Sequence, residues 1–263
     1  MHYETLTITV TDKVATVTLN RPGLRNAFNE GAIAELALAF DELGRNELVR
    51  AIVLAANGPA FCAGADLNWM KKMAGYSDDE NRADAARLAD MLRTIYLCPK
   101  PTVAKVQGDC YAGGMGLVAA CDIVVAAVGV NFCLSEVKLG LIPATISPYV
   151  IKAMGEQAAR RYFLTAERFD ADAALRMGFA HEVAAADSLD TTVAAIAKAL
   201  VSNSPHAVAE AKKLVREVVG APVTDALLAD TAARIAAIRA SNEGREGVAS
   251  FLEKRKPSWL NQG

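Results

Sequence analysis

The chain has 263 residues, of which 52% are hydrophobic and 22% are charged, and its formal net charge is −2. That length and apolar content allow one large core, or a core with a small helical subdomain, and they exclude a disordered chain. The small net charge gives no electrostatic footprint for nucleic acid, so we expect no nucleic-acid partner.

The opening residues and the cysteines indicate the compartment. The first residues lack the basic and apolar regions of a secretory signal. No apolar run is as long as a membrane span, which needs about 18 residues. The five cysteines show no C-x-x-C spacing and lie mostly in apolar surroundings, and the three histidines are dispersed. We therefore expect a cytoplasmic protein with no membrane association, disulfide or metal site.

The first half of the chain is predicted to alternate strands with helices. Apolar–polar alternation indicates a hairpin, continuous apolar runs indicate buried strands paired in parallel, and capping residues indicate helix starts. The predicted elements are a hairpin of strands 6–10 and 14–19, a helix from Asn29 to about Leu43, a strand at 51–56, a helix from Ser77 to near Tyr96, strands at 103–107 and 123–127, and a short strand near Phe132.

Two turns of small residues interrupt this half, each between a strand and a helix. Residues 63–65 read Ala-Gly-Ala, and residues 113–116 read Gly-Gly-Met-Gly before an apolar helical segment at 117–121. Small residues let a ligand approach the backbone, and the free N–H groups in the first turn of a helix favour negative charge. Each turn is therefore a candidate anion or oxyanion site.

Glu136 is the carboxylate that the pattern singles out. It follows a second apolar run and has Phe132, Leu134, Val137 and Leu139 as near neighbours in the sequence. Desolvation in such surroundings would raise its pKa and make it useful as an acid or base.

Other interpretations of the glycine-rich turn compete with an oxyanion site. Gly114-x-Gly116-x-x-Ala119 fits the dinucleotide fingerprint, and Glu136 stands where that fold places its ribose-binding acid. However, residues 109–112 separate the pattern from the preceding strand, and about a hundred residues come before it. A purely structural interpretation is also open, with glycines for close helix packing and a solvated Glu136.

Past Pro143 the pattern becomes wholly helical. The predicted helices lie from Ser147 to Gly155, at 156–164, from Asp170 to Gly178, and at 187–201, 205–218, 223–240 and 243–253. The apolar faces of the last helices exceed what a subdomain of this size needs for its own burial, which favours an oligomer interface. We divide the chain into a core of residues 1–200 and a helical oligomerisation region of residues 201–263.

Several spaced motifs give the chain a family resemblance. They are L-N-R-P at 19–22, N-A-F at 26–28, F-C-A-G-A-D-L at 61–67, G-D-C-Y-A-G-G-M-G at 108–116, F-C-L-S-E-V-K-L-G-L-I-P at 132–143 and F-L-E-K-R-K at 251–256. In this order they resemble the enoyl-CoA hydratase/isomerase (crotonase) superfamily over the whole chain. The resemblance implies an α/β fold, a spiral of repeated β-β-α units with a C-terminal α-helical region, assembled as homotrimers or homohexamers. It displaces the dinucleotide interpretation.

The resemblance also implies roles for individual residues. The backbone N–H groups of Ala65 and Gly113 would form an oxyanion hole for an acyl-CoA thioester, and Glu136 would be the acid or base. The implied coenzyme A contacts are Arg25, Ala27, Ala63, Gly64, Asp66, Leu67 and Gly114, with Phe251 and Lys254 reaching the nucleotide of a neighbouring subunit. Coenzyme A arrives as part of the substrate, so no separate cofactor or metal is expected.

The sequence departs from the family pattern at one catalytic position. Hydratases of this family carry a second glutamate three residues after the oxyanion glycine, where this chain has Gly116. Members with a single glutamate are often isomerases that move a proton between two carbons. The candidates for replacing the missing carboxylate are Asp109, Thr145, Ser147 and Tyr149.

Two segments resemble the bacterial methylglutaconyl-CoA hydratases of leucine catabolism more closely. They are A-D-L-N-W-M-K-K-M at 65–73 and L-I-P-A-T-I-S-P-Y at 141–149. The distal carboxylate of such a substrate would pair with Lys138 or Lys72, and Trp69 is expected in the wall of the acyl pocket or in the core.

The expected activity is therefore hydration of a 2-enoyl-CoA. A 3,2-enoyl-CoA isomerase that uses Glu136 is the alternative enzyme. A non-catalytic scaffold that binds coenzyme A or RNA is the alternative from another class, and the retention of both turns and of Glu136 argues against it.

Overall fold

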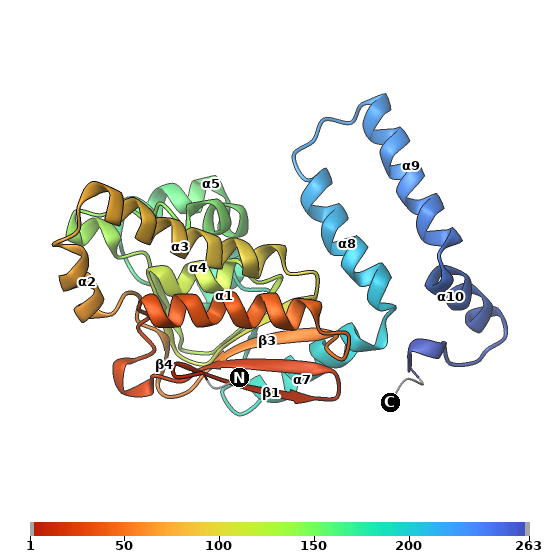
Figure 1. Cartoon of the computed structure of the whole chain (residues 1–263), viewed down its shortest axis with the longest axis horizontal. Coiled ribbons are helices and arrows are strands. Elements are labelled where there is room, and N and C mark those ends of the chain that lie inside the picture. The colour runs from red at the N-terminus through yellow and green to blue at the C-terminus, as the bar shows by residue number, and fades with distance from the viewer. Residues whose placement is uncertain (1–2, 261–263) are drawn as a thin grey trace.

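Residues 3–260, which the computed structural model describes, build a six-stranded and a four-stranded β-sheet (Figure 1). The strands of the six-stranded sheet are, in spatial order, β1 (Leu6–Thr11), β2 (Val14–Leu19), β3 (Ala51–Ala56), β5 (Thr102–Val106), β7 (Ile123–Ala127) and β10 (Glu182–Ala184). The strands of the four-stranded sheet are β4 (Ala60–Cys62), β6 (Asp109–Tyr111), β8 (Asn131–Cys133) and β9 (Phe169–Asp170).

The predicted strands of the larger sheet pair as the sequence pattern indicates, and β10, which was not predicted, joins them. β1 and β2 form the antiparallel hairpin, and β2, β3, β5, β7 and β10 then pair in parallel. Every residue of β3 is buried, as expected for a parallel strand that is covered on both faces. Helix α7 (Leu189–Ser202) packs on β3, β5 and β7, while α1 (Glu30–Arg45) packs on β1 and on α3 (Asp78–Leu97).

The element order confirms the repeated β-β-α unit. The series β1-β2-α1, β3-β4-α2 and β5-β6-α4 repeats it three times, with α2 at Leu67–Met73 and α4 at Gly113–Ala119. Because the second strand of the later units joins the smaller sheet, the strand-to-helix turns that follow β4 and β6 meet at one place.

Helix starts are set by the predicted caps. Asn29 accepts a hydrogen bond from the Ala32 N–H, and Ser77 and Glu80 form a complete capping box at the start of α3. Helix α5 (Ser147–Thr165) consists of two helical stretches that meet at Gly155, whose φ of 78° and ψ of 159° are non-helical, and this confirms the helix end that the sequence predicted there. Helix α6 spans Ala171–Arg176.

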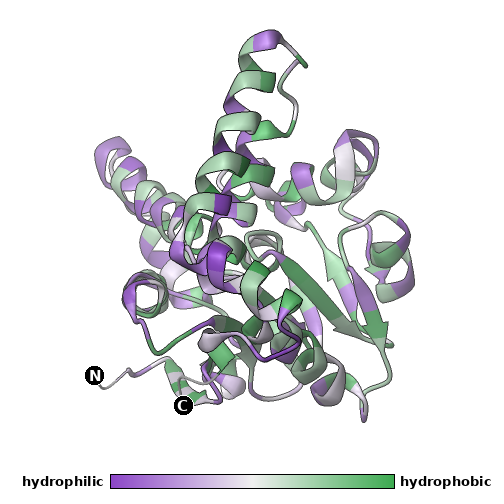
Figure 2. Ribbon diagram, turned by 90° about the vertical axis from the view of Figure 1, so that its right-hand side faces the viewer, coloured by the Kyte–Doolittle hydropathy of each residue, from purple (hydrophilic) through white to green (hydrophobic). Residues whose placement is uncertain are grey.

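The last helices, α8 (Pro205–Val218), α9 (Asp225–Ala240) and α10 (Asn242–Leu252), form an arm that leaves the body of the molecule (Figure 1). We call residues 205–252 the C-terminal arm. No described residue of α8 or α9 is buried, and Figure 2 shows apolar residues interleaved with polar ones along the arm. The division at residue 200 falls near the end of α7, and the arm as an oligomerisation region stays a prediction.

The sequence mispredicted the start of α4 and overlooked short strands. The helix begins at Gly113 itself rather than at Leu117, and residues 109–111, which were taken to separate the glycines from a strand, are strand β6. A strand of three residues is too short to show a period of two, so its sequence carries no signal. Within residues 3–260, no helix has the length and apolar character needed to cross a bilayer.

Candidate active site

The two turns of small residues lie against each other. Strands β4 and β6 pair in parallel, with Cys62 opposite Cys110, so the turns leave the sheet side by side. A Cβ added to Gly114 would lie 2.7 Å from the Cβ of Cys62, and one added to Gly64 would lie 3.1 Å from that of Ala112. Both glycines are therefore required for this approach, which supports the structural interpretation of the glycines as well as a ligand site.

Each turn presents a backbone N–H without a protein acceptor. Around Ala65, the Phe28 N–H donates to the Gly64 carbonyl (2.9 Å) and the Asp66 N–H donates to the Phe28 carbonyl (3.0 Å). Among residues 3–260, the N–H groups of Ala65 and Gly113 themselves donate to no protein atom. Since Gly113 opens α4, its N–H also lies at the positive end of that helix.

The backbone conformation of Ala112 and two contacts fix the position of Gly113. Ala112 takes the strained combination of φ 48° and ψ −123°, and its N–H donates to the Cys133 carbonyl at 2.8 Å. On the other side, a Cβ on Gly113 would lie 2.4 Å from Cζ of Phe28. The Phe28 ring thus packs on the glycine and leaves room for no other residue there.

Glu136 extends from the strand next to this turn. It follows β8, which pairs with β6 through Cys133 and Tyr111, and it opens a short 3-10 turn at Glu136–Leu139. The side chain is half-buried, and its Oε2 is buried without a hydrogen-bond partner among the described residues. Burial raises the pKa of Glu136 above its ordinary value of 4.5, so the carboxylate is poised to accept a proton.

An apolar side chain fills the space beside Gly116. A Cβ on Gly116 would lie 2.2 Å from Cγ2 of Ile146 and 3.5 Å from Cδ2 of Leu92. Ile146 is only 2% exposed. The position where the family places a second glutamate is therefore closed by hydrocarbon in this chain.

Most of the predicted substitutes for that glutamate are engaged elsewhere. Asp109 accepts hydrogen bonds from the Tyr111 hydroxyl (2.5 Å) and the Asn131 N–H (3.0 Å). The Ser147 hydroxyl donates to the Ala144 carbonyl, and the Tyr149 ring packs on Tyr96 with centroids 5.3 Å apart. Of the four candidates, Thr145 alone makes no side-chain hydrogen bond or ring contact with the described residues.

The first turn also carries a buried ion pair. Asp66 accepts from Nη2 of Arg21 (2.8 Å) and from the Asn68 N–H (2.8 Å), which caps α2. Burial raises the pKa of Asp66, but the Asn68 N–H and Arg21 outweigh burial and hold it below its ordinary value. Arg21 also donates to the Ala27 carbonyl at 2.6 Å, so Asp66 and Ala27 are joined through one guanidinium.

A small cavity adjoins the same turn. Its volume is about 250 Å³, and Arg25, Ala63, Asp109 and Tyr111 contribute to its lining. The Ala63 N–H donates to the Arg25 carbonyl at 3.0 Å, and Arg25 makes no ion pair within residues 3–260. Leu67, at the start of α2, is 74% exposed. The structure therefore places Arg25, Ala63, Gly64, Asp66 and Leu67 around one turn.

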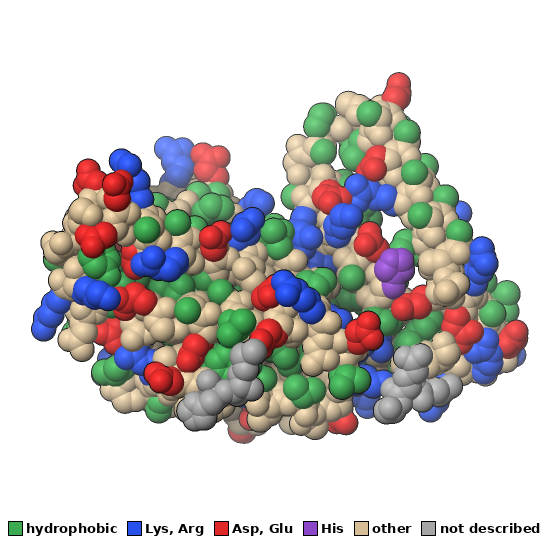
Figure 3. All heavy atoms as spheres, viewed as in Figure 1, with side chains coloured by type: hydrophobic (Ala, Val, Ile, Leu, Met, Phe, Trp, Pro, Cys, Tyr) green, Lys and Arg blue, Asp and Glu red, His purple; other side chains and the backbone are tan. Residues whose placement is uncertain are grey.

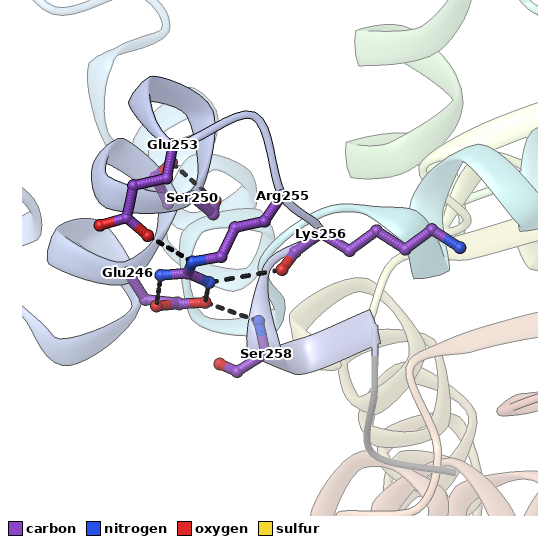
Figure 4. Close-up of polar contacts among 7 residues, drawn as sticks. Glu246, Ser250, Glu253, Arg255, Lys256 and Ser258 are labelled. Carbon is purple, nitrogen blue, oxygen red and sulfur yellow. Dashed lines mark hydrogen bonds and ion pairs between the residues drawn. The ribbon is translucent and has the colours of Figure 1, made fainter.

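Phe251 and Lys254 lie apart from the turns in this single chain. Phe251 lies at the end of the C-terminal arm and is 82% exposed, and Lys254 follows directly after the arm. The neighbouring Arg255 is held by Glu246 (2.6 and 2.9 Å) and Glu253 (2.6 Å), as Figure 4 shows. The hydrogen bonds from Arg255 and then from the Ser258 N–H lower the pKa of Glu246 to about 2. In the basic run 254–256, Arg255 is thus structural.

Sequence reasoning missed two residues that shape the site. Phe28 stands in the N-A-F motif, but no pattern shows that its ring would cover Gly113. Ile146 lies in the segment before α5 and belongs to no apolar repeat of a helix or strand, so the sequence pattern did not mark it as a site residue. Within residues 3–260, no group of three His, Cys, Asp or Glu side chains could hold a metal ion.

Comparisons with known proteins agree on one family. The family model described as "Enoyl-CoA hydratase/isomerase" matches residues 9–262. The chain is 31% identical to the short-chain-enoyl-CoA hydratase of Clostridium acetobutylicum (93% of each chain) and 32% identical to the mevalonyl-coenzyme A hydratase of Aspergillus fumigatus (95% of this chain, 92% of that one). The crystal structure of an enoyl-CoA hydratase from Shewanella pealeana is 45% identical and superposes with a TM-score of 0.95, covering 97% of this chain and 96% of that one.

The buried carboxylate leads to a stability prediction. Because burial raises the folded-state pKa of Glu136, its contribution to stability is complete below 4.5 and is lost as the pH rises through the folded pKa. Glu136→Gln, which stays neutral, should therefore melt at a higher temperature than the wild type at pH 7, with a gap that narrows toward pH 5. Calorimetry from pH 5 to 8 measures this. Glu156→Gln, at a side chain that is 80% exposed, should show no such gap, and a Glu136→Gln protein that melts at or below the wild-type temperature at pH 7 and 8 would contradict the burial argument.

Proposed function

The chain belongs to the enoyl-CoA hydratase/isomerase family, and we propose that it adds water across the double bond of a 2-enoyl-CoA thioester. The observation that carries this proposal is the buried, unpartnered Oε2 of Glu136 just past strand β8, which pairs with β6, together with two turns that each present a free N–H. A carboxylate with a raised pKa and two preorganised donors are the groups that such a reaction needs.

The proposed mechanism assigns the developing charge to the two turns. The thioester oxygen accepts hydrogen bonds from the N–H groups of Ala65 and Gly113. It becomes an enolate oxygen as the new C–O bond forms at C3. Each such donor is typically worth about 3–4 kcal/mol in the transition state, and the N-terminus of α4 adds to this. Glu136 takes a proton from the attacking water and returns it to C2, so that water is added with no net change at the carboxylate.

The coenzyme A portion is proposed to lie along the first turn. Arg25 supplies an unpaired cation for a phosphate, and the small residues Ala27, Ala63, Gly64 and Gly114 leave backbone groups accessible. Exposed Leu67 offers an apolar surface, whereas buried Asp66 acts through Arg21 and the cap of α2. Phe251 and Lys254 would reach the nucleotide from a neighbouring subunit. No separate cofactor is proposed.

A second candidate is a 3,2-enoyl-CoA isomerase, which the contact between Gly116 and Ile146 favours. Without a second carboxylate there is one acceptor fewer to orient water. An isomerase needs only one proton carrier, which removes a proton from C2 and delivers it to C4. A scaffold without catalysis is disfavoured, because a buried unpartnered carboxylate oxygen costs stability and has no structural role.

Activity assays on Glu136 variants test the base. We expect crotonyl-CoA to lose its conjugated absorbance with the wild type, and Glu136→Gln to lower kcat by about 10²–10⁴-fold, while Glu156→Gln has no effect. Because the base must be ionised, kcat/KM should fall as the pH drops through the raised pKa of Glu136. Full activity in Glu136→Gln would remove the proposed base. Appearance of conjugated absorbance from a 3-enoyl-CoA, without incorporation of labelled water, would support the isomerase.

The finer proposal for the substrate is 3-methylglutaconyl-CoA, of leucine degradation. Lys72 is committed to Glu30, at 2.5 Å, whereas exposed Lys138 makes no ion pair within residues 3–260 and lies two residues from Glu136. Trp69 is 4% exposed and packs on Phe28, with ring centroids 6.0 Å apart, so it belongs to the core behind the turn. We therefore assign the distal carboxylate to Lys138.

Substitution of Lys138 tests this assignment. Lys138→Gln should raise the KM for 3-methylglutaconyl-CoA by about tenfold, the usual effect of losing a hydrogen bond to a charged group, and leave crotonyl-CoA unchanged. The matched control is Lys71→Gln, at another exposed lysine near the first turn. An equal change for both substrates, or none for either, would show that Lys138 does not read the distal carboxylate.

We further propose a homotrimer or homohexamer that the C-terminal arm holds together. Val219, Val223 and Leu252 on the arm are between 65% and 81% exposed, more apolar surface than a free arm would keep. The five buried thiols fit a reducing, cytoplasmic compartment.

The mass in solution tests the assembly. Light scattering should give three or six times the chain mass of 27.8 kDa, and Val223→Asp should lower it. The control is Leu48→Asp, at an apolar residue that is 76% exposed on the body. A wild-type mass of one chain at micromolar concentration would rule out the proposed assembly.

A further inference from the structure

A second cavity lies between the body and helix α8, at the far end of α4 from Gly113. Its volume is about 590 Å³, and its lining includes Ala119 and Cys121 at the end of α4, the first residues of β7, and side chains of α3, α5 and α8. Figure 3 shows several Lys and Arg side chains near the notch where the C-terminal arm leaves the body. The mechanism proposed above uses none of these groups.

Two cations in the cavity share one tyrosine and lack a carboxylate. Lys152 Nζ lies 5.3 Å from the Tyr96 ring centroid and 3.5 Å from its hydroxyl, and Arg216 Cζ lies 5.9 Å from the same centroid. Neither cation forms an ion pair within residues 3–260, and Nη1 of Arg216 is buried without a hydrogen-bond partner there. Two positive charges that contact the same ring and pair with no described carboxylate are left uncompensated, and an anion would stabilise both.

The carboxylate in the lining is already neutralised. Asp122 forms an ion pair with Nζ of Lys212 at 2.6 Å. It also accepts hydrogen bonds from the N–H and the hydroxyl of Thr102, at 2.7 and 2.9 Å. The Lys212 side chain is only 7% exposed, so this pair is a fixed part of the wall. Among the described charged residues of the lining, Lys152 and Arg216 therefore remain as an excess of two positive charges.

One more donor borders the cavity. Nδ1 of His181 accepts the Val124 N–H at 3.0 Å, which places the proton of the neutral ring on Nε2. Tyr149, Leu200 and Val208 add aromatic and aliphatic wall. The cavity thus combines cationic donors on one side with an apolar surface for an organic group.

We propose that this cavity binds a small organic phosphate monoester, with its headgroup between Lys152 and Arg216. A phosphate monoester carries a charge of about −1.5 to −2 at pH 7, which matches the two unpaired cations, and a guanidinium fork suits its oxygens. The cavity has the size of ordinary small-molecule sites, about 300–1,000 Å³. Arg216 thus brings a donor that no described residue satisfies to the wall of a cavity of small-molecule size.

Binding of phenyl phosphate to the full-length protein tests the site. At constant ionic strength and about ten times the dissociation constant, phenyl phosphate should raise the melting temperature by about 3 °C, while phenol should not. Arg216→Gln and Lys152→Gln should each weaken binding by about tenfold or more in calorimetric titration. Lys213→Gln removes the same charge from α8 outside the lining and should bind as the wild type does.

Several outcomes would overturn the proposal. One is the same affinity in Arg216→Gln and Lys213→Gln, and another is no binding by the wild type at millimolar phenyl phosphate. Displacement of phenyl phosphate by coenzyme A, together with unchanged phenyl phosphate affinity in Arg216→Gln and Lys152→Gln, would place it at the first turn instead. If the wild type does not bind phenyl phosphate and the mass of its assembly falls in Arg216→Gln, the two cations would instead pair with carboxylates of a second copy. If Arg216→Gln does not fold, as judged by circular dichroism, Lys152→Gln and Arg216→Lys decide the question.

Discussion

The close approach of two backbone turns is the constraint on which the rest of the site depends. A Cβ on Gly108 would lie 2.2 Å from the Pro59 carbonyl oxygen, and one on Gly114 would lie 2.7 Å from the Cβ of Cys62, so β4 and β6 approach each other at both ends. Strands of three residues form few hydrogen bonds of their own, and glycines let them pack where side chains would keep them apart. Two N–H groups are thereby held without acceptors, which is the preorganisation that stabilisation of a developing oxyanion requires.

The electrostatics of the reacting centre follow from what surrounds that approach. Phe28, Ile146 and Leu92 close it with hydrocarbon, so charge inside it is poorly solvated. Low polarity strengthens each hydrogen bond to an enolate and raises the pKa of Glu136 at the same time. The apolar contact beside Gly116 excludes a second carboxylate, and burial raises the pKa of the one that remains, Glu136.

The sequence predicted those parts of the fold that have a local cause. Asn29 and Ser77 cap their helices as expected, and β3 is buried as its continuous apolar run indicated. The small-residue turns and the carboxylate in an apolar run, visible in a window of a few residues, singled out candidate sites, and the family resemblance then proposed Ala65, Gly113 and Glu136. Contacts between distant segments were not predictable in this way. Ile146 meets Gly116 only because α5 folds back over α4, which no local pattern encodes.

The arm shows a further limit of local pattern, which concerns charge rather than packing. The helix of residues 205–218 was predicted with its observed bounds, yet nothing in that segment indicates that Arg216 and Lys152 contact the same Tyr96 ring. Glu246 and Arg255, which are nine residues apart, neutralise each other in an ion pair and require no further partner. Lys152 of α5 and Arg216 of α8 differ, because they pair with no described carboxylate and the folded chain alone leaves their charges uncompensated. A fold retains such an arrangement at a cost, and a bound anion is the simplest physical reason for keeping it.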